Sequence, residues 1–153
     1  MLAYHYDILC FTETQVDNTY TDNEVFQPSN KTIYRKDRNF HEGEVMSAIE
    51  PSLYPAPVNI SFDIWSIEAV AIHVVLSRKD LVVVCLYILS NGVKDSLSSF
   101  NDLVGRINNN SSLLILGDFN FPDMNWTKGV INSGSNQKEL HKYFLNLHMN
   151  CIS

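Results

Sequence analysis

The apolar residues of this chain fall into short runs interrupted by polar segments, a pattern that favours β-strands over long helices. We predict strands in "DILCFTET", "KTIYRKDR", "EVMSAIE", "EAVAIHVVL", "LVVVCLYIL" and "LLILGD". Only the polar "SRKD" at residues 77–80 separates the fourth run from the fifth, so we expect an antiparallel hairpin there. The polar stretch 17–30 and the cluster of Pro51, Pro55 and Pro57 indicate loops.

Two segments carry apolar residues at helical spacing instead. One runs to Ile107 and begins after a cap at Asp95 or Ser96, and the other covers about 137–149 after the capping-box-like pair Asn136 and Glu139. The pattern is therefore α/β: a mixed, largely antiparallel sheet arrangement covered by helices, rather than a parallel βαβ series. The apolar stripes consist of Leu97, Phe100, Leu103, Val104 and Ile107 in the first helix, and of Leu140, Phe144 and Leu147 in the second.

Composition and charge narrow the class of protein. The chain has 153 residues, of which 45% are apolar and 18% charged, a composition typical of one globular domain. Its net charge is −6, whereas proteins that hold nucleic acid by bulk electrostatics are usually basic. Any contact with DNA must therefore be local or assisted from outside this chain.

The cysteines and the apolar runs exclude several further classes. Cys10, Cys85 and Cys151 are odd in number and far apart, so the sequence suggests neither a zinc site nor a disulfide framework. A reducing, intracellular compartment fits best. The longest apolar run, residues 81–89, is too short to cross a membrane, and the N-terminus does not read as a signal peptide.

Polar residues that end buried strands are the candidates for chemistry, because such residues reach the rim of a sheet. Glu13, Tyr87, Asp118 and Asn120 occupy these positions. Carboxylates suit a hard cation or a general base, and an amide and a phenol can hydrogen-bond phosphoryl oxygens. The alternatives are that Glu13 only solvates a strand end, that Asp118 and Asn120 form an Asx-type turn, and that Tyr87 is an ordinary strand aromatic.

Four segments, in the order "DILCFTET", "YRKDR", "LVVVCLY" and "LLILGDFNFPDMNW", resemble the endonuclease/exonuclease/phosphatase superfamily. They are most similar to the endonuclease domains of non-LTR retrotransposons. The resemblance implies a two-sheet α/β sandwich and hydrolysis of phosphodiester bonds with Mg²⁺, or with Mn²⁺ as an alternative. It further implies nicking of target DNA, to leave a 3′ hydroxyl that primes a reverse transcriptase, and hence action in the nucleus.

The same resemblance assigns roles to the four candidates. Glu13 matches the metal-binding glutamate and Asp118 the aspartate that orients or activates the attacking water. Asn120 matches the asparagine that positions this water and contacts the phosphate, and Tyr87 the tyrosine near the scissile phosphate.

Several departures from the family pattern bear on these roles. The expected first strand with its asparagine and the final Ser-Asp-His segment do not occur, and none of the five histidines is assigned a catalytic role. A glycine-rich segment is replaced by His41, Glu42, Gly43 and Glu44. We therefore expect residues 1–153 to be a single, incomplete domain. Three hypotheses remain: a DNA-nicking enzyme, an inactive transposon remnant that at most binds metal or a partner, and a phosphatase, which "FPDMNW" disfavours. The oligomeric state stays open.

Overall fold

The computed structural model describes most of the first 131 residues. The described residues are 5–26, 30–37, 44–60, 67–77, 79–89, 103–105, 107, 111–125, 128 and 130–131. Their strands form a three-stranded sheet, a four-stranded sheet and one separate two-stranded pair.

The first sheet has three antiparallel strands in the order β1-β3-β2. Its central strand β3 is buried at every position, which explains why apolar and small residues fill it. The register pairs Thr12 with Val45, so the end of β1 lies beside the start of β3. All three strands were predicted from the sequence, and the structure confirms them. Their bounds are β1 (Ile8–Thr12), β2 (Thr32–Lys36) and β3 (Val45–Ile49).

The second sheet has four strands in the order β4-β5-β6-β7 and is mixed, because β6 and β7 are parallel while the other pairs are antiparallel. The predicted hairpin is confirmed: β5 and β6 pair along their full lengths, and the chain reverses at Ser77, whose φ is +56°. The bounds are β4 (Ala56–Val58), β5 (Ile67–Leu76), β6 (Lys79–Ile88) and β7 (Ser112–Asp118).

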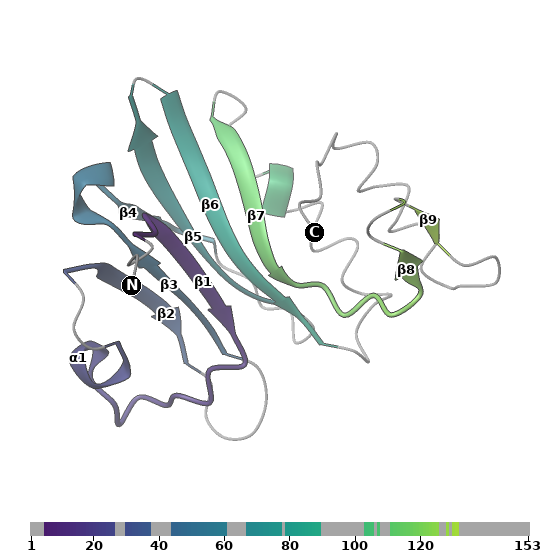
Figure 1. Cartoon of the computed structure of the whole chain (residues 1–153), viewed down its shortest axis with the longest axis horizontal. Coiled ribbons are helices and arrows are strands. Elements are labelled where there is room, and N and C mark those ends of the chain that lie inside the picture. Colours follow the sequence, from purple (N-terminus) through teal and green to yellow (C-terminus); the bar gives the residue numbers. More distant parts are fainter. Residues whose placement is uncertain are drawn as a thin grey trace.

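The two sheets pack face to face, with the first sheet on the left of the second in Figure 1. Between them lies an apolar cluster to which Ile49 of the first sheet and Ile72 and Val83 of the second contribute. A second cluster covers the opposite face of the second sheet and includes Leu103 and Ile107. The described part is therefore sheet-rich with few helices, an arrangement compatible with an α/β sandwich.

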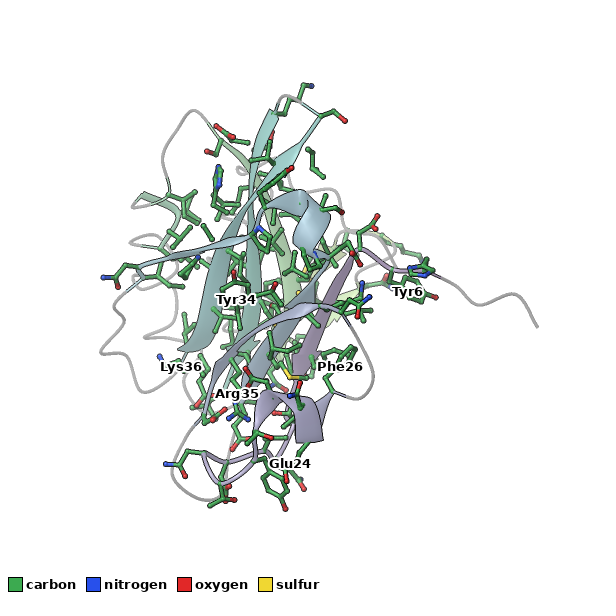
Figure 2. All side chains as sticks on the ribbon, turned by 90° about the vertical axis from the view of Figure 1, so that its left-hand side faces the viewer. Tyr6, Glu24, Phe26, Tyr34, Arg35 and Lys36 are labelled. Carbon is green, nitrogen blue, oxygen red and sulfur yellow. The ribbon has the colours of Figure 1, made fainter. Side chains whose placement is uncertain are left out.

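The loop predictions were wrong in two places. Residues 17–30 contain a one-turn helix, α1 (Asp22–Val25). A capping box between Thr21 and Glu24 caps its N-terminus. Phe26 packs on Phe11 with ring centroids 5.7 Å apart, which holds this segment against the first sheet. Figure 2 shows Glu24, Phe26 and Arg35 at the same end of the molecule.

The proline-rich stretch also forms structure where a loop was expected. A 3₁₀ turn, η1 (Pro51–Leu53), precedes β4, and β4 itself contains Pro57. Proline is tolerated there because β4 is an edge strand, where a missing backbone N–H need not break a ladder.

The described residues include only a small part of the two expected helices. Residues 103–105 are helical, and the backbone N of Ile107 donates to the carbonyl of Leu103 at 3.2 Å. The rest of that helix and the helix expected at 137–149 lie outside the described residues. A two-stranded pair, β8 (Met124–Asn125) with β9 (Val130–Ile131), was not predicted.

Candidate functional site

The ends of β1, β6 and β7 meet at one rim of the sandwich, the lower one in Figure 1. Glu13 follows β1 directly, Tyr87 is the penultimate residue of β6, and Asp118 is the last residue of β7. The phenol of Tyr87 donates a hydrogen bond of 2.6 Å to Oε1 of Glu13. This bond joins the two sheets and brings together two residues that lie 74 positions apart in the sequence.

Tyr87 and Asp118 are direct neighbours across the parallel β6–β7 ladder. Residues paired in register point to the same face of a sheet. Tyr87 packs with Val45 and Cys85, so this face is the one that meets the first sheet. Asp118 is exposed at the end of the same row. The pairing therefore sets a solvent-accessible carboxylate beside a largely buried phenol.

Asn120 and Asp118 are fixed relative to each other by a local turn. The backbone N of Asn120 donates to Oδ1 of Asp118 at 2.8 Å, which is the Asx-type turn proposed as an alternative from the sequence. Asn120 adopts a left-handed φ of +49°, which asparagine tolerates better than most residues. Its amide Nδ2 donates to the carbonyl of Ile88 at 2.6 Å. The turn thus ties the amide to the end of β6, next to Tyr87.

Gly117 explains how β7 can run so close to β6 before it presents Asp118. Its φ is +138°, and a Cβ at this position would lie 1.8 Å from the carbonyl oxygen of Leu86. That oxygen belongs to the backbone of the neighbouring strand and cannot move aside cheaply. Glycine is therefore required at this point. In the "GD" of the motif, Gly117 meets the demand of the backbone and Asp118 supplies the carboxylate.

The electrostatics of the rim keep the phenol protonated. The hydrogen bond to Glu13, burial and the negative charge of Glu13 raise the pKa of Tyr87 to about 12, and Asp118 adds to the rise while Asn120 opposes it. Two nearby carboxylates disfavour a phenolate because it would add a third negative charge. At neutral pH, Tyr87 is therefore a hydrogen-bond donor.

A further carboxylate that the sequence did not reveal lies in the same row. Glu68 of β5 pairs with Tyr87 across the antiparallel ladder and is only 2% exposed. The sole signal in the sequence was a glutamate at the start of an apolar run. Such a residue usually marks the solvated edge of a strand, so its burial could not be foreseen.

His73 lies away from this rim, near the turn that joins β5 and β6. Nε2 of His73 lies 3.2 Å from Oδ1 of Asp80, across the β5–β6 hairpin close to its turn. The contact gives His73 a polar partner within an otherwise apolar strand. His41, His141 and His148 lie outside the described residues.

The rim offers carboxylate oxygens of the kind that Mg²⁺ binds. Within the described ranges no group of three or more histidine, cysteine or acidic side chains could hold a metal ion. Mg²⁺ does not need such a cage, because it usually keeps several waters and binds one or two carboxylates together with substrate phosphates. Glu13 and Asp118 are exposed hard-oxygen donors on either side of Tyr87, and this set fits such a partial shell.

The comparison with known families bears on this rim. Residues 81–153 match the family described as endonuclease-reverse transcriptase. This match supports a relationship of residues 81–153 to the retrotransposon endonucleases of the endonuclease/exonuclease/phosphatase superfamily. The matched range contains Tyr87, Asp118 and Asn120 but not Glu13, which the structure alone brings to the other three. No curated protein matches the chain at a significant level.

Two further observations concern the environment of the protein. Cys10 and Cys85 are free thiols, the second of them fully buried, among the residues that the structure describes. The hydrogen bond with the Cys10 thiol, together with burial, raises the pKa of Cys85. No helix within the described ranges is long and apolar enough to span a membrane.

Proposed function

We propose that this endonuclease-like domain is a Mg²⁺-dependent phosphodiesterase that nicks DNA. The observation that carries the proposal is the Tyr87–Glu13 hydrogen bond of 2.6 Å, with Asp118 paired to the same tyrosine. It sets two carboxylates and a protonated phenol around one exposed rim. The relationship to endonuclease-reverse transcriptase proteins supports phosphodiesters as the substrate class.

In this proposal Glu13 holds the metal, which supplies charge stabilisation for the phosphodiester when it is bound. Asp118 orients the attacking water and accepts its proton as the water oxygen bonds to phosphorus. The P–O3′ bond breaks, and the 3′ oxygen takes a proton from solvent to leave as a hydroxyl. Oδ1 of Asp118 already accepts the backbone N–H of Asn120, so Oδ2 is the oxygen assigned to the water. Carboxylates are common general bases when they lie within hydrogen-bond reach of the proton they accept.

Tyr87 and Asn120 serve as donors to the phosphoryl oxygens. A pKa of about 12 keeps the phenol protonated, so Tyr87 can shift its hydrogen bond from Glu13 to a phosphate oxygen. Donors fixed in advance stabilise developing charge better than water does, because they need no reorganisation. The anchoring of Asn120 to the end of β6 meets this requirement.

The match of residues 81–153 to endonuclease-reverse transcriptase proteins supports a biological role in nicking target DNA to leave a 3′ hydroxyl for reverse transcription. We propose the nucleus as the site of action, because the target DNA of such a role lies there. With a net charge of −6, the chain needs a local contact or an accompanying segment to hold DNA.

The experiment is a supercoiled-plasmid nicking assay with Mg²⁺ and with EDTA. Asp118→Asn is the test variant, because an asparagine oxygen still accepts the hydrogen bond of the turn while the base is lost. Asp80→Asn is the matched control, since Asp80 lies at the far end of β6. We expect Mg²⁺-dependent nicking by the parent and by Asp80→Asn, and a loss of about 100-fold or more in Asp118→Asn.

Two results would reject the proposal. A folded parent chain that leaves the plasmid supercoiled would favour an inactive relative of the family. Nicking that persists in Asp118→Asn at the parent rate would assign the activity to other residues or to a contaminant.

A further inference from the structure

The chain leaves β1 through an unfavourable backbone conformation. Glu13 and Gln15 have φ values of +55° and +53°, in the left-handed region. Residues with a side chain rarely adopt this conformation, and it persists only where the surrounding structure holds it. The direction of the Glu13 carboxylate therefore depends on whatever fixes the turn from Glu13 to Val16.

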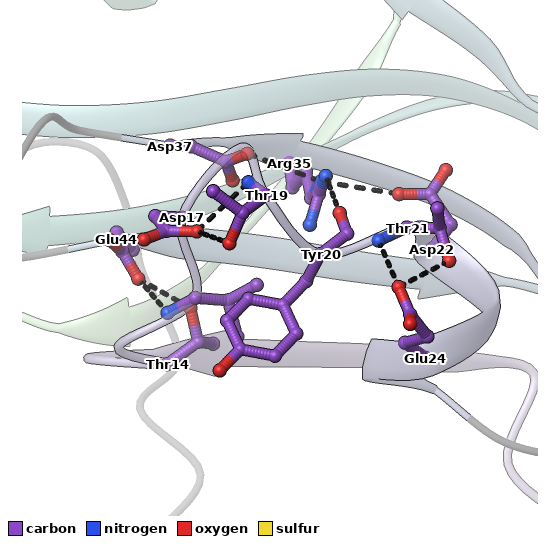
Figure 3. A network of polar contacts seen from close by, with 11 residues as sticks. Thr14, Asp17, Thr19, Tyr20, Thr21, Asp22, Glu24, Arg35, Asp37 and Glu44 are labelled. Carbon is purple, nitrogen blue, oxygen red and sulfur yellow. Dashed lines mark hydrogen bonds and ion pairs between the residues drawn. The ribbon is translucent and has the colours of Figure 1, made fainter.

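Glu44, the residue before β3, contacts this turn at three points. Its backbone carbonyl accepts the N–H of Glu13 at 2.9 Å. Its Oε2 accepts the hydroxyl of Thr14 at 3.2 Å and also the backbone N–H of Val16. Glu44 is only 9% exposed, so these bonds are shielded from competing water. Figure 3 shows the Glu44 carboxylate directed at this turn beside Thr14.

We propose that Glu44 is a positioning residue for the site, which holds the Glu13–Val16 turn so that the Glu13 carboxylate faces Tyr87. It acts through Glu13 and has no assigned contact with the substrate. The catalytic part of this inference rests on the proposed function. The structural part, that Glu44 sets the Glu13–Tyr87 hydrogen bond, can be tested without any activity.

The competing explanation is that Glu44 merely stabilises the fold as a satisfied buried carboxylate. Glu50 offers a matched control, because it flanks the opposite end of β3 and forms an ion pair of 3.1 Å with Lys31. Loss of either carboxylate can reduce stability. Only loss of Glu44 is expected to change the pKa of Tyr87.

The test is a titration of the Tyr87 phenol, read as the ultraviolet difference between each protein and its Tyr87→Phe counterpart. In the parent the pKa of Tyr87 is about 12, and the hydrogen bond to Glu13 is the largest cause. In Glu44→Ala we expect this pKa to fall toward the ordinary value of 10. In Glu50→Ala it stays as in the parent. In Glu44→Gln it stays close to the parent value, because an amide oxygen can still accept the two hydrogen bonds.

Glu44→Asp keeps the charge but is one methylene shorter, so it cannot reach Thr14 and Val16 together. We expect it to lower the Tyr87 pKa by less than Glu44→Ala does. If Glu44→Ala does not fold, the titration of Glu44→Asp decides whether Glu44 sets the Glu13–Tyr87 hydrogen bond. A folded Glu44→Ala, or Glu44→Asp in its place, in which Tyr87 titrates as in the parent overturns the proposal, as does an equal shift in Glu50→Ala.

The nicking assay tests whether Glu44 also affects catalysis. We expect Glu44→Ala to reduce Mg²⁺-dependent nicking at least about tenfold, because misplacing a reacting group by even an ångström costs up to about 100-fold. Glu44→Gln should retain most of the rate. If the parent does not nick at all, the proposed function fails, while the Tyr87 titration still decides whether Glu44 sets the hydrogen bond. If Glu44→Ala shifts the titration but nicks at the parent rate, its positioning role in catalysis is overturned.

Discussion

The two halves of the rim are held in different ways. Tyr87 and Asp118 belong to the β6–β7 ladder, in which backbone hydrogen bonds fix the register over seven successive pairs. Glu13 belongs to a strained turn that a few bonds to one neighbouring residue, Glu44, keep in place. The half formed by Tyr87 and Asp118, the ladder half, therefore depends on backbone geometry, while the half formed by Glu13, the turn half, depends on individual side chains. Substitutions can therefore disturb the two halves separately.

The largest expected effect comes from breaking the ladder half at Gly117. Gly117→Ala places a methyl group 1.8 Å from the carbonyl oxygen of Leu86, in a backbone conformation that alanine avoids. We expect a loss of at least about 3 kcal/mol in the free energy of unfolding, measured by urea denaturation. Gly105→Ala is the control, because a Cβ there meets nothing within 4 Å. It should be neutral or up to about 1 kcal/mol more stable, since alanine favours the helical conformation. Equal losses in both variants would contradict the close approach at Gly117.

The next effect concerns the bond that joins the halves and appears at alkaline pH. The folded-state pKa of Tyr87, about 12, exceeds the ordinary value of 10. The stabilisation linked to this rise is fully present below pH 10 and is lost as the pH increases through about 12. We expect the parent to lose about 2–3 kcal/mol over this range from Tyr87 alone. The free energy of unfolding of Tyr87→Phe, from denaturation curves, should lack this loss. An equal fall in the free energy of unfolding of both proteins between pH 10 and 12 would refute the role of Tyr87.

A moderate effect is expected where a second side chain anchors the segment that follows the turn. Nη2 of Arg35 donates to the carbonyl of Tyr20 at 2.6 Å, and Nε forms ion pairs with Asp22 and Asp37 at 3.2 and 3.4 Å (Figure 3). Arg35→Ala should reduce the free energy of unfolding by about 1–3 kcal/mol. Limited proteolysis should then cut residues 14–24 faster. Lys36→Ala, at the exposed next position, should change stability by less than about 0.5 kcal/mol. Unchanged proteolysis in Arg35→Ala would show that this anchor is dispensable.

The smallest effect concerns the cap of α1. Oε2 of Glu24 accepts from both the backbone N and the hydroxyl of Thr21, each at 2.8 Å. Because this cap is exposed, we expect Glu24→Ala to leave global stability within experimental error. Amide hydrogen exchange should accelerate in residues 21–25 only. Asn23→Ala, in the same turn, should not alter exchange at the cap, and acceleration throughout the first sheet would contradict a local role.

The sequence predicted the ladder half of the rim better than the turn half. β6 and β7 are uniform apolar runs, and the "GD" that ends the second of them indicates a polar group at a strand end. Local periodicity carries that information. It does not carry register, so the pairing of Tyr87 with Asp118 was visible only in the structure.

The turn half was harder to predict, because its signals are tertiary. The sequence marked Glu44 only as a departure from a glycine-rich pattern, and nothing local tied it to Thr14 or Val16. The α1 helix was missed because one turn is too short to show periodicity, although Thr21 and Glu24 form a capping box that could have revealed it. β4 was missed because Pro57 favours a loop unless the strand is known to lie at an edge.

Glu13 lies outside the range matched to the family, and we assign it to the same site as Asp118 because both contact or pair with Tyr87. The most direct measurement is Mg²⁺-dependent plasmid nicking by the parent and by Glu13→Gln, a change that removes charge with little change in size. We predict a loss of more than about 100-fold, because even groups that only support metal ligands are worth about 10–100-fold. A folded Glu13→Gln that nicks at the parent rate, while Asp118→Asn is inactive, would contradict the claim.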